Sequence, residues 1–273
     1  MLNIFWAIKF ILLNKKKYQK RNGDKIILLE LFDHKASIIS NGIFSNELAK
    51  LKNARVIGYE PYFLNLKGKI KNIFYKINFI SHYYLYKSYG LHSILIPFKG
   101  SENKKVNKIY KSILKNIKKK SDVLNIKFET INVGDLIYDT YLRENKKSTI
   151  DIHSPKFLEY LKNSIRLYLY WSNFFKKNNV AGIILSHSVY LRALPLRIAC
   201  DKKIDVYNVG FSSAYKLTKN KPLKFAYFKE LPTIFKTFKS NIKKNLIKVA
   251  KKNIKLRFSG KKDIVHKTNE TLE

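Results

Sequence analysis

Short apolar runs alternate along the chain with longer segments whose apolar positions recur every three to four residues. Five runs have the length and composition of buried strands: residues 25–31, 54–60, 92–98, 181–187 and 204–210. The segments between them have helical spacing: residues 36–51, 66–89, 103–120, 155–177 and 189–200. Strands that are apolar on both faces and separated by helices predict a parallel sheet covered on two sides. The expected fold class is α/β, a Rossmann-like parallel sheet with helices on both faces.

The same pattern divides the chain into three parts. Residues 1–22 join the apolar run MLNIFWAIKFILL to the basic stretch KKKYQKR. Because a bilayer crossing takes about 20 apolar residues, we expect either a helix anchored at the membrane surface or an ordinary first helix packed on the domain. Residues 23–218 form the expected Rossmann-like domain. Residues 219–273 are basic, with a helix predicted over 231–252 and a strand end or linker over 255–263.

The balance of charge changes this picture. The formal net charge is +36, and only seven of the 55 basic residues are arginine. Compositional bias toward Lys, Asn and Ile explains such a count without any partner, although an anionic membrane surface attracts each basic residue by roughly 1 kcal/mol. Nucleic acid is the least supported partner, because the lysines are scattered and bidentate arginines are few. The single cysteine, Cys200, excludes an intrachain disulfide and fits a cytoplasmic protein. The apolar and basic segment 1–22 would place this protein peripherally on the inner face of the plasma membrane.

Several common site motifs are missing from the sequence. It contains no GxGxxG, no GxxxxGK[ST], no GxSxG and no His-Cys cluster with metal-ligand spacing. Dinucleotide enzymes, P-loop NTPases, nucleophile-elbow hydrolases and zinc enzymes are therefore poorly supported. No metal or other cofactor is expected.

A first polar cluster lies in GDLIYDTYLR, residues 134–143. In a helix, Asp135, Asp139 and Arg143 step by four and share one face. The carboxylates could bind sugar hydroxyls, or one of them could take a proton from a nucleophile. The alternative is a ladder of ion pairs along the helix, with Asp135 near the helix N-terminus.

A second polar cluster follows the apolar run that ends at Leu185. Its members are Ser186, His187, Ser188, Tyr190, Arg192 and Arg197. Polar side chains at the carboxyl end of a buried strand lie where open α/β sheets bind ligands. His187 could act as a base or a hydrogen-bond donor, and Arg192 could hold an anionic sugar or phosphate. The alternative is a loop histidine with a structural role only.

VGDLIYDTYLR and the later segment SHSVYLRALPLRIACDKKIDVYNV resemble parts of a known family. They are similar to the amino-terminal half of bacterial capsule and surface-polysaccharide biosynthesis proteins of the GT-B glycosyltransferase type. The similarity runs from about residue 25 to 263, including RFSGKKD, and is specific only in these two segments.

The resemblance implies two Rossmann-like domains with a cleft between them. The amino-terminal domain faces the acceptor, and the carboxyl-terminal domain holds the nucleotide sugar. The resemblance implies that seven residues face this cleft: Asp135, Tyr138, Asp139, Arg143, His187, Tyr190 and Arg192. We expect Asp139, Asp135 or His187 to act in catalysis, with the identity of the base left open. We expect substrate binding by Tyr138, Arg143, Ser186, Tyr190 and Arg192.

The expected function is therefore that of the acceptor-side domain of a glycosyltransferase. Sugar would pass from a nucleotide sugar to a saccharide or lipid-linked acceptor. No run of strands and helices follows Gly260, so we expect a donor-domain polypeptide to supply the missing half, or that half to have been lost. Whether the chain is an enzyme by itself stays open. The alternatives are a non-catalytic protein that binds polyanions or membrane surfaces, and a truncated, inactive gene product.

Overall fold

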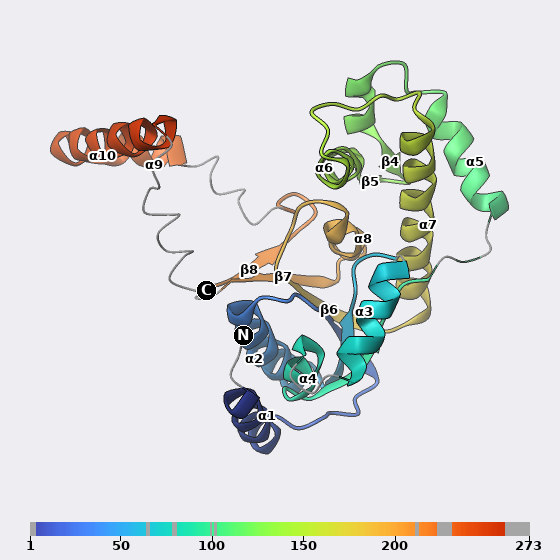
Figure 1. Cartoon of the computed structure of the whole chain (residues 1–273), viewed down its shortest axis with the longest axis vertical. Helices are drawn as coiled ribbons and strands as arrows, with labels where there is room; N and C mark the ends of the chain where they lie inside the picture. The colour runs from blue at the N-terminus through green and yellow to red at the C-terminus, as the bar shows by residue number, and fades with distance from the viewer. Residues whose placement is uncertain are drawn as a thin grey trace. The chain divides into compact units, whose positions relative to one another are not determined.

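The computed structural model describes residues 4–63, 66–77, 81–98, 100, 103–210, 213–222 and 231–259. The chain divides into two compact units, Met1–Lys224 and Phe225–Glu273. The first unit contains a six-stranded sheet between layers of helices (Figure 1). The second unit contains two helices, α9 (Leu231–Thr237) and α10 (Ser240–Phe258).

The sheet has the strand order β3-β2-β1-β6-β7-β8. Its strands are β1 (Lys25–Glu30), β2 (Ala54–Tyr59), β3 (Leu91–Leu95), β6 (Val180–Leu185), β7 (Asp205–Val209) and β8 (Ala214–Leu217). The first five run parallel, and β8 closes one edge in the antiparallel direction. The predicted Rossmann-like α/β fold is confirmed.

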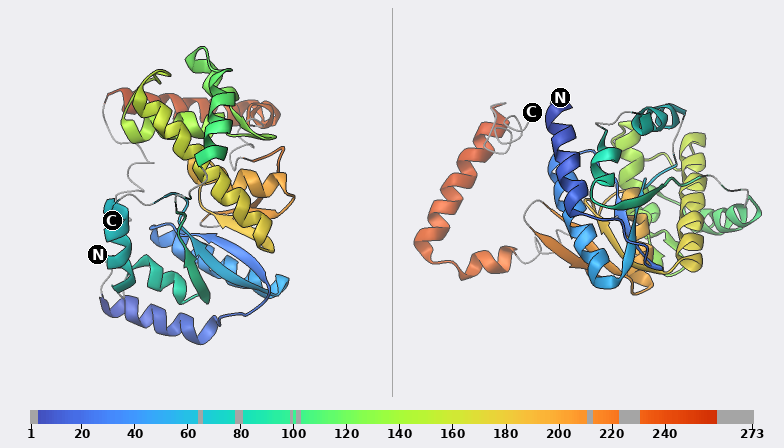
Figure 2. Two further views of the ribbon diagram at one scale, coloured as in Figure 1. Left: turned by 90° about the vertical axis from the view of Figure 1, so that its right-hand side faces the viewer. Right: turned by 90° about the horizontal axis from the view of Figure 1, so that it is seen from below.

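Helices cover both faces of this sheet (Figure 2). On one face lie α1 (Ile4–Lys17), α2 (Lys35–Lys52), α3 (Leu66–Ile77) and α4 (His82–Lys87). On the other face lie α7 (Pro155–Lys177) and α8 (Leu194–Asp201). Because side chains alternate along a strand, Ile27 and Leu29 of β1 join the core under α2, whereas Ile26 and Leu28 join the core under α7.

A small subdomain is inserted between β3 and α7. It consists of α5 (Asn103–Leu114), the 3₁₀ helix η1 (Lys120–Asn125), the two-stranded ribbon β4 (Lys127–Phe128) and β5 (Ile131–Asn132), and α6 (Gly134–Asn145). Both α5 and α6 contact α7. The Ser154 hydroxyl caps α7 by accepting from the Phe157 amide, and Pro155 occupies the first turn, where no amide donor is needed. A long helix therefore begins at residue 155, as predicted.

The structure differs from the sequence predictions at several helix ends. The helix predicted over 66–89 is two helices, α3 and α4, and α5 stops at Leu114 rather than at residue 120. A 3₁₀ turn, η2 (Leu191–Ala193), precedes α8, so the helix predicted from residue 189 begins at Leu194. The prediction of a strand end or linker over 255–263 is wrong for residues 255–258, which belong to α10. Residues 260–263 of this prediction lie outside the described part of the chain.

The first helix belongs to the first unit and packs against it on one side. Phe10 and Tyr18 both contact the ring of Tyr89, with ring centroids 5.9 and 4.9 Å apart. The opposite side of α1 exposes Ile8 and Leu12, and Leu13 is exposed one turn beyond Phe10. Among the helices of the described residues, none has the length and apolar character needed to cross a membrane.

Candidate functional site

The direction of strand addition reverses between β1 and β6. From β1 the chain adds β2 and β3 on one side of the sheet, and then returns to add β6 and β7 on the other. Open α/β sheets bind ligands at such a reversal, outside the carboxyl ends of the strands. Glu30 ends β1, and Ser186 follows the last residue of β6.

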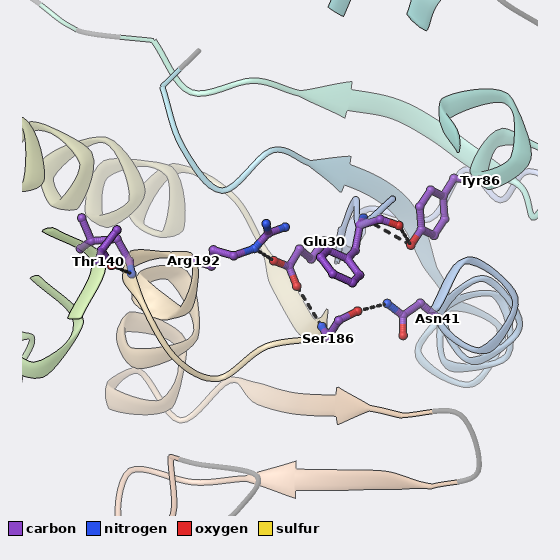
Figure 3. A network of polar contacts seen from close by, with 8 residues as sticks. Glu30, Asn41, Tyr86, Thr140, Ser186 and Arg192 are labelled. Carbon is purple, nitrogen blue, oxygen red and sulfur yellow. Dashed lines mark hydrogen bonds and ion pairs between the residues drawn. The ribbon is translucent and has the colours of Figure 1, made fainter. Parts of the chain in front are cut away.

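Four residues around this reversal form a hydrogen-bonded group, which we call the edge cluster: Glu30, Asn41, Ser186 and Arg192 (Figure 3). The fully buried Glu30 carboxylate accepts from Arg192 Nε at 2.7 Å and from the Ser186 amide at 2.9 Å. The Ser186 hydroxyl accepts from Asn41 Nδ2 at 2.8 Å. A buried carboxylate is stable only with such partners, so Glu30 fixes both the loop after β6 and the Arg192 guanidinium.

Aromatic rings surround the Arg192 guanidinium. It lies 5.1 Å from the ring centroid of Phe32 and 5.9 Å from that of Tyr62. The His187 ring packs edge-on against Phe32, with centroids 4.6 Å apart. Burial raises the pKa of the Tyr62 hydroxyl well above its ordinary value, so this group is a neutral donor at physiological pH. The result is a cation held among aromatic faces beside a neutral hydroxyl.

The strand register extends this polar region across the sheet. Tyr59 of β2 pairs with Glu30 of β1, and Asn208 of β7 pairs with Leu185 of β6. Leu29 of β1 pairs with Ile184 of β6, so Glu30 and Leu185 are the next residues along these two neighbouring strands. The Tyr59 hydroxyl and both polar atoms of the Asn208 side chain are buried without a hydrogen-bond partner among the described residues. Unsatisfied buried groups of this kind cost free energy and are usually bonded to water or to a ligand. Both residues are fully buried, so they add unpaired polar groups beneath this edge of the sheet rather than an exposed binding surface.

Helix α6 is joined to the loop that carries Arg192. The Thr140 hydroxyl accepts from the Leu191 amide at 2.7 Å, and the Arg143 guanidinium lies 4.7 Å from the ring centroid of Tyr190 (Figure 3 shows the first contact). Tyr190 has φ of +61°, a conformation that strains a residue with a side chain. Strain of this kind persists where the surrounding structure enforces it, and it concentrates at functional sites.

The two aspartates of α6 have different surroundings. Asp135, in the first turn, pairs with Arg197 of α8 at 2.7 Å. Asp139 is exposed, and the described residues include no ion pair between it and Arg143. Partial desolvation and the nearby charge of Asp135 raise the pKa of Asp139. The predicted ladder of ion pairs along α6 is therefore replaced by one bridge to α8.

The structure thus brings some predicted site residues together more closely than others. Ser186 and Arg192 meet through Glu30, and Arg143 meets Tyr190. Tyr138 is half-buried and packs against the core under α7.

The sequence prediction overlooked several residues of this region: Glu30, Asn41, Tyr59, Tyr62 and Asn208. Glu30 ends the run KIILLE, and Asn208 comes near the end of the run DVYNV. Both could have been found by the rule that selected Ser186 and His187, a polar residue where a buried strand ends. The same rule applies to Tyr59, whose hydroxyl comes at the last position of β2. Asn41 and Tyr62 carry no comparable signal, because only the packing of α2 and the loop path bring them to this edge.

Other features of the first unit do not coincide with these residues. A hollow of about 340 Å³ between α5 and α7 is lined by residues that include Val106, Tyr170 and Phe174, and by none of the predicted site residues. Within the described ranges, no group of three or more His, Cys, Asp or Glu side chains has an arrangement that could hold a metal ion.

No protein-family model, no curated protein and no solved structure matches the chain. The resemblance of two segments to polysaccharide biosynthesis proteins stays a prediction.

Proposed function

We propose that the unit Met1–Lys224 is the acceptor-side domain of a GT-B-type glycosyltransferase for capsule or surface polysaccharide. The observation that carries the proposal is the edge cluster at the reversal of strand order, beside aromatic rings and unpaired buried hydroxyl and amide groups. Saccharides have hydroxyls that both donate and accept, and ring faces of C–H groups that pack on aromatic side chains. A few fixed polar groups among aromatic rings suit such a ligand.

The geometry supports a role for every predicted residue except Tyr138, which packs against the core. Arg192 and Arg143 would bind anionic groups of the acceptor, with Tyr190 and Ser186 beside them. Asp139 is the best candidate for the base, since a raised pKa makes a carboxylate a better proton acceptor at neutral pH. His187 is the second candidate. Asp135, held by Arg197, would fix α6 against α8.

In the proposed reaction an acceptor hydroxyl attacks the anomeric carbon of a nucleotide sugar. The new glycosidic bond forms as the bond to the nucleoside diphosphate breaks, and the hydroxyl proton passes to the base. The nucleotide sugar would be held by a second domain on another polypeptide, at the inner face of the plasma membrane.

Saturation-transfer NMR tests the acceptor assignment. The chain is mixed in turn with neutral saccharides, uronic acids and nucleotide sugars. We expect saccharide or uronic acid signals that weaken strongly in Arg143→Ala and Tyr190→Ala, both at the surface of the loop region. Arg166→Ala on α7, whose partner Glu159 is exposed, is the matched control and should bind as the wild type does. Binding of nucleotide sugars alone, or equal signals in all variants, would contradict the proposal.

A second candidate function, polyanion binding, is favoured by the second unit. No acidic residue lies between residues 231 and 259, whereas eight lysines do, and α10 exposes Lys244, Lys248, Lys251, Lys252 and Lys255. Helices of this composition bind anionic polymers and surfaces. A salt titration with single-stranded DNA separates the two candidates, because binding through many lysines weakens steeply with salt whereas saccharide recognition through hydrogen bonds does not.

A further inference from the structure

A groove lies between α1, α2 and α4, on the sheet face opposite the core under α7. Its volume is about 300 Å³, at the lower end for small-molecule sites. Its lining is Lys9, Phe10, Leu13, Lys35, Ile38, Ile39 and Leu85. Apart from the two lysines every lining side chain is a hydrocarbon, so the groove offers a ligand almost no hydrogen bonds.

Exposed apolar side chains lie in this groove and beside it. Leu13 of α1 lines the groove and is 58% exposed, and Ile39 of α2 lines it with Ile43 exposed one turn further along. Ile8 and Leu12 of α1, which are 49% and 57% exposed, face away from Phe10 and add apolar surface on the other side of the helix. Exposed apolar side chains gathered on neighbouring helices mark a docking site for a partner or a membrane.

The charges around the groove limit what the occupant can be. Lys9 and Lys35 belong to the lining, and α1 ends in Lys15, Lys16 and Lys17. Among the described residues of α1, α2 and α4, Glu47 is the only acidic one, and it is not part of the lining. An apolar channel with a basic rim is complementary to a molecule with a hydrocarbon chain and an anionic head.

We infer that this groove holds one hydrocarbon chain of an anionic membrane lipid. Lys9 and Lys35 face the phosphate of its headgroup, and the exposed apolar side chains of α1 enter the interface of the bilayer. A second copy of this chain is a poor occupant, because two molecules with the same basic rim and a formal charge of +36 repel each other. The inference does not depend on the proposed transfer reaction.

Calorimetric titration of the full chain with monomeric dodecanoate tests the groove directly. We expect saturable binding of one molecule, and binding of dodecyltrimethylammonium, with the same chain and a cationic head, that is at least about tenfold weaker. Leu13→Asp, and the double variant Lys9→Glu with Lys35→Glu, should each weaken dodecanoate binding by about tenfold or more. Leu51→Asp is the matched control, because Leu51 is 82% exposed on α2 and lies outside the lining.

Vesicle sedimentation then tests the membrane as the source of the chain. Phosphatidylcholine vesicles with phosphatidylglycerol should sediment wild type and Leu51→Asp, but far less of the groove variants, and pure phosphatidylcholine should sediment none of them well. Dodecanoate binding that is unchanged in the groove variants, or lost equally in Leu51→Asp, overturns the inference. Vesicle binding that is equal in all variants assigns the membrane contact to the basic helices of the second unit and overturns the lipid assignment. Neither failure would change the saccharide signals expected in the saturation-transfer NMR experiment, so the two proposals fail independently.

Discussion

Replacing Arg192 by Met should destabilise the first unit strongly, because it leaves the Glu30 carboxylate buried with one remaining partner. Glu30 is fully buried, its Oε1 accepts from Arg192 Nε at 2.7 Å, and within the described part of the chain its Oε2 accepts only from the Ser186 amide. Removing one member of a buried ion pair typically costs about 3–5 kcal/mol, since the other charge loses its compensation. We expect the free energy of unfolding to fall by about this amount.

The chain offers a matched control for this variant. Arg166 is as exposed as Arg192, at 20% of its side chain, but its partner Glu159 is 58% exposed. Arg166→Met should therefore cost less than about 1 kcal/mol. The comparison separates the effect of an uncompensated buried charge from that of losing an arginine side chain.

Urea unfolding followed by tryptophan fluorescence measures these differences, in a Trp6→Phe background so that the buried Trp171 reports alone. Adding Glu30→Gln to Arg192→Met should restore part of the stability, because the neutral amide still accepts from the Ser186 amide and no charge stays buried. A loss below about 1 kcal/mol for Arg192→Met, or a double variant less stable than the single one, would refute this reasoning.

Three other predictions concern the same unit. Thr140→Val leaves the buried Leu191 amide without an acceptor, so urea unfolding should show a loss of about 1–3 kcal/mol. Tyr190→Gly relieves a positive φ and should raise stability by about 1 kcal/mol in the same assay while weakening saccharide signals in NMR. Lys216 and Lys52 donate hydrogen bonds to the Asp205 carboxylate and lie close to its charge, and the hydrogen bond from Lys216 has the largest effect on its pKa. Together they lower the pKa of Asp205 below its ordinary 3.8. A depressed pKa stabilises the fold above that value, so the advantage of wild type over Asp205→Asn should be constant near pH 7 and shrink as the pH falls below 3.8 in acid-unfolding curves.

The strands β1, β2, β6 and β7 could be predicted well from the sequence because they are largely buried. Between Lys25 and Glu30 every position of β1 is apolar, so its length and its type are evident without tertiary information. The edge strand β8 is mostly exposed, and the sequence pattern did not predict it. Helix α7 was equally clear, since Ser154 and Pro155 mark its start. The ribbon of β4 and β5 is too short to give a period, and no pattern predicted it.

The candidate site was only partly predictable, for a physical reason. Its members come from loops whose conformation depends on distant contacts. The η2 turn forms where the Leu191 amide meets Thr140, 51 positions away, so local spacing predicted a helix there instead. The choice of Arg197 as the partner of Asp135 likewise depends on how α8 packs against α6, whereas the sequence suggested a partner on the same helix.

The central pair of strands has a consequence for how the protein is made. On one side β1 pairs with β2, which follows it closely in the sequence. On the other side it pairs with β6, and the paired residues Ile26 and Val180 are 154 positions apart. During synthesis the open edge of a strand with four consecutive apolar residues is therefore exposed until that segment leaves the ribosome. Pairings so distant form slowly and leave nascent chains prone to association. Ribosome-bound chains ending before residue 180 should require chaperones, and chains extended past residue 217 should become protease-resistant.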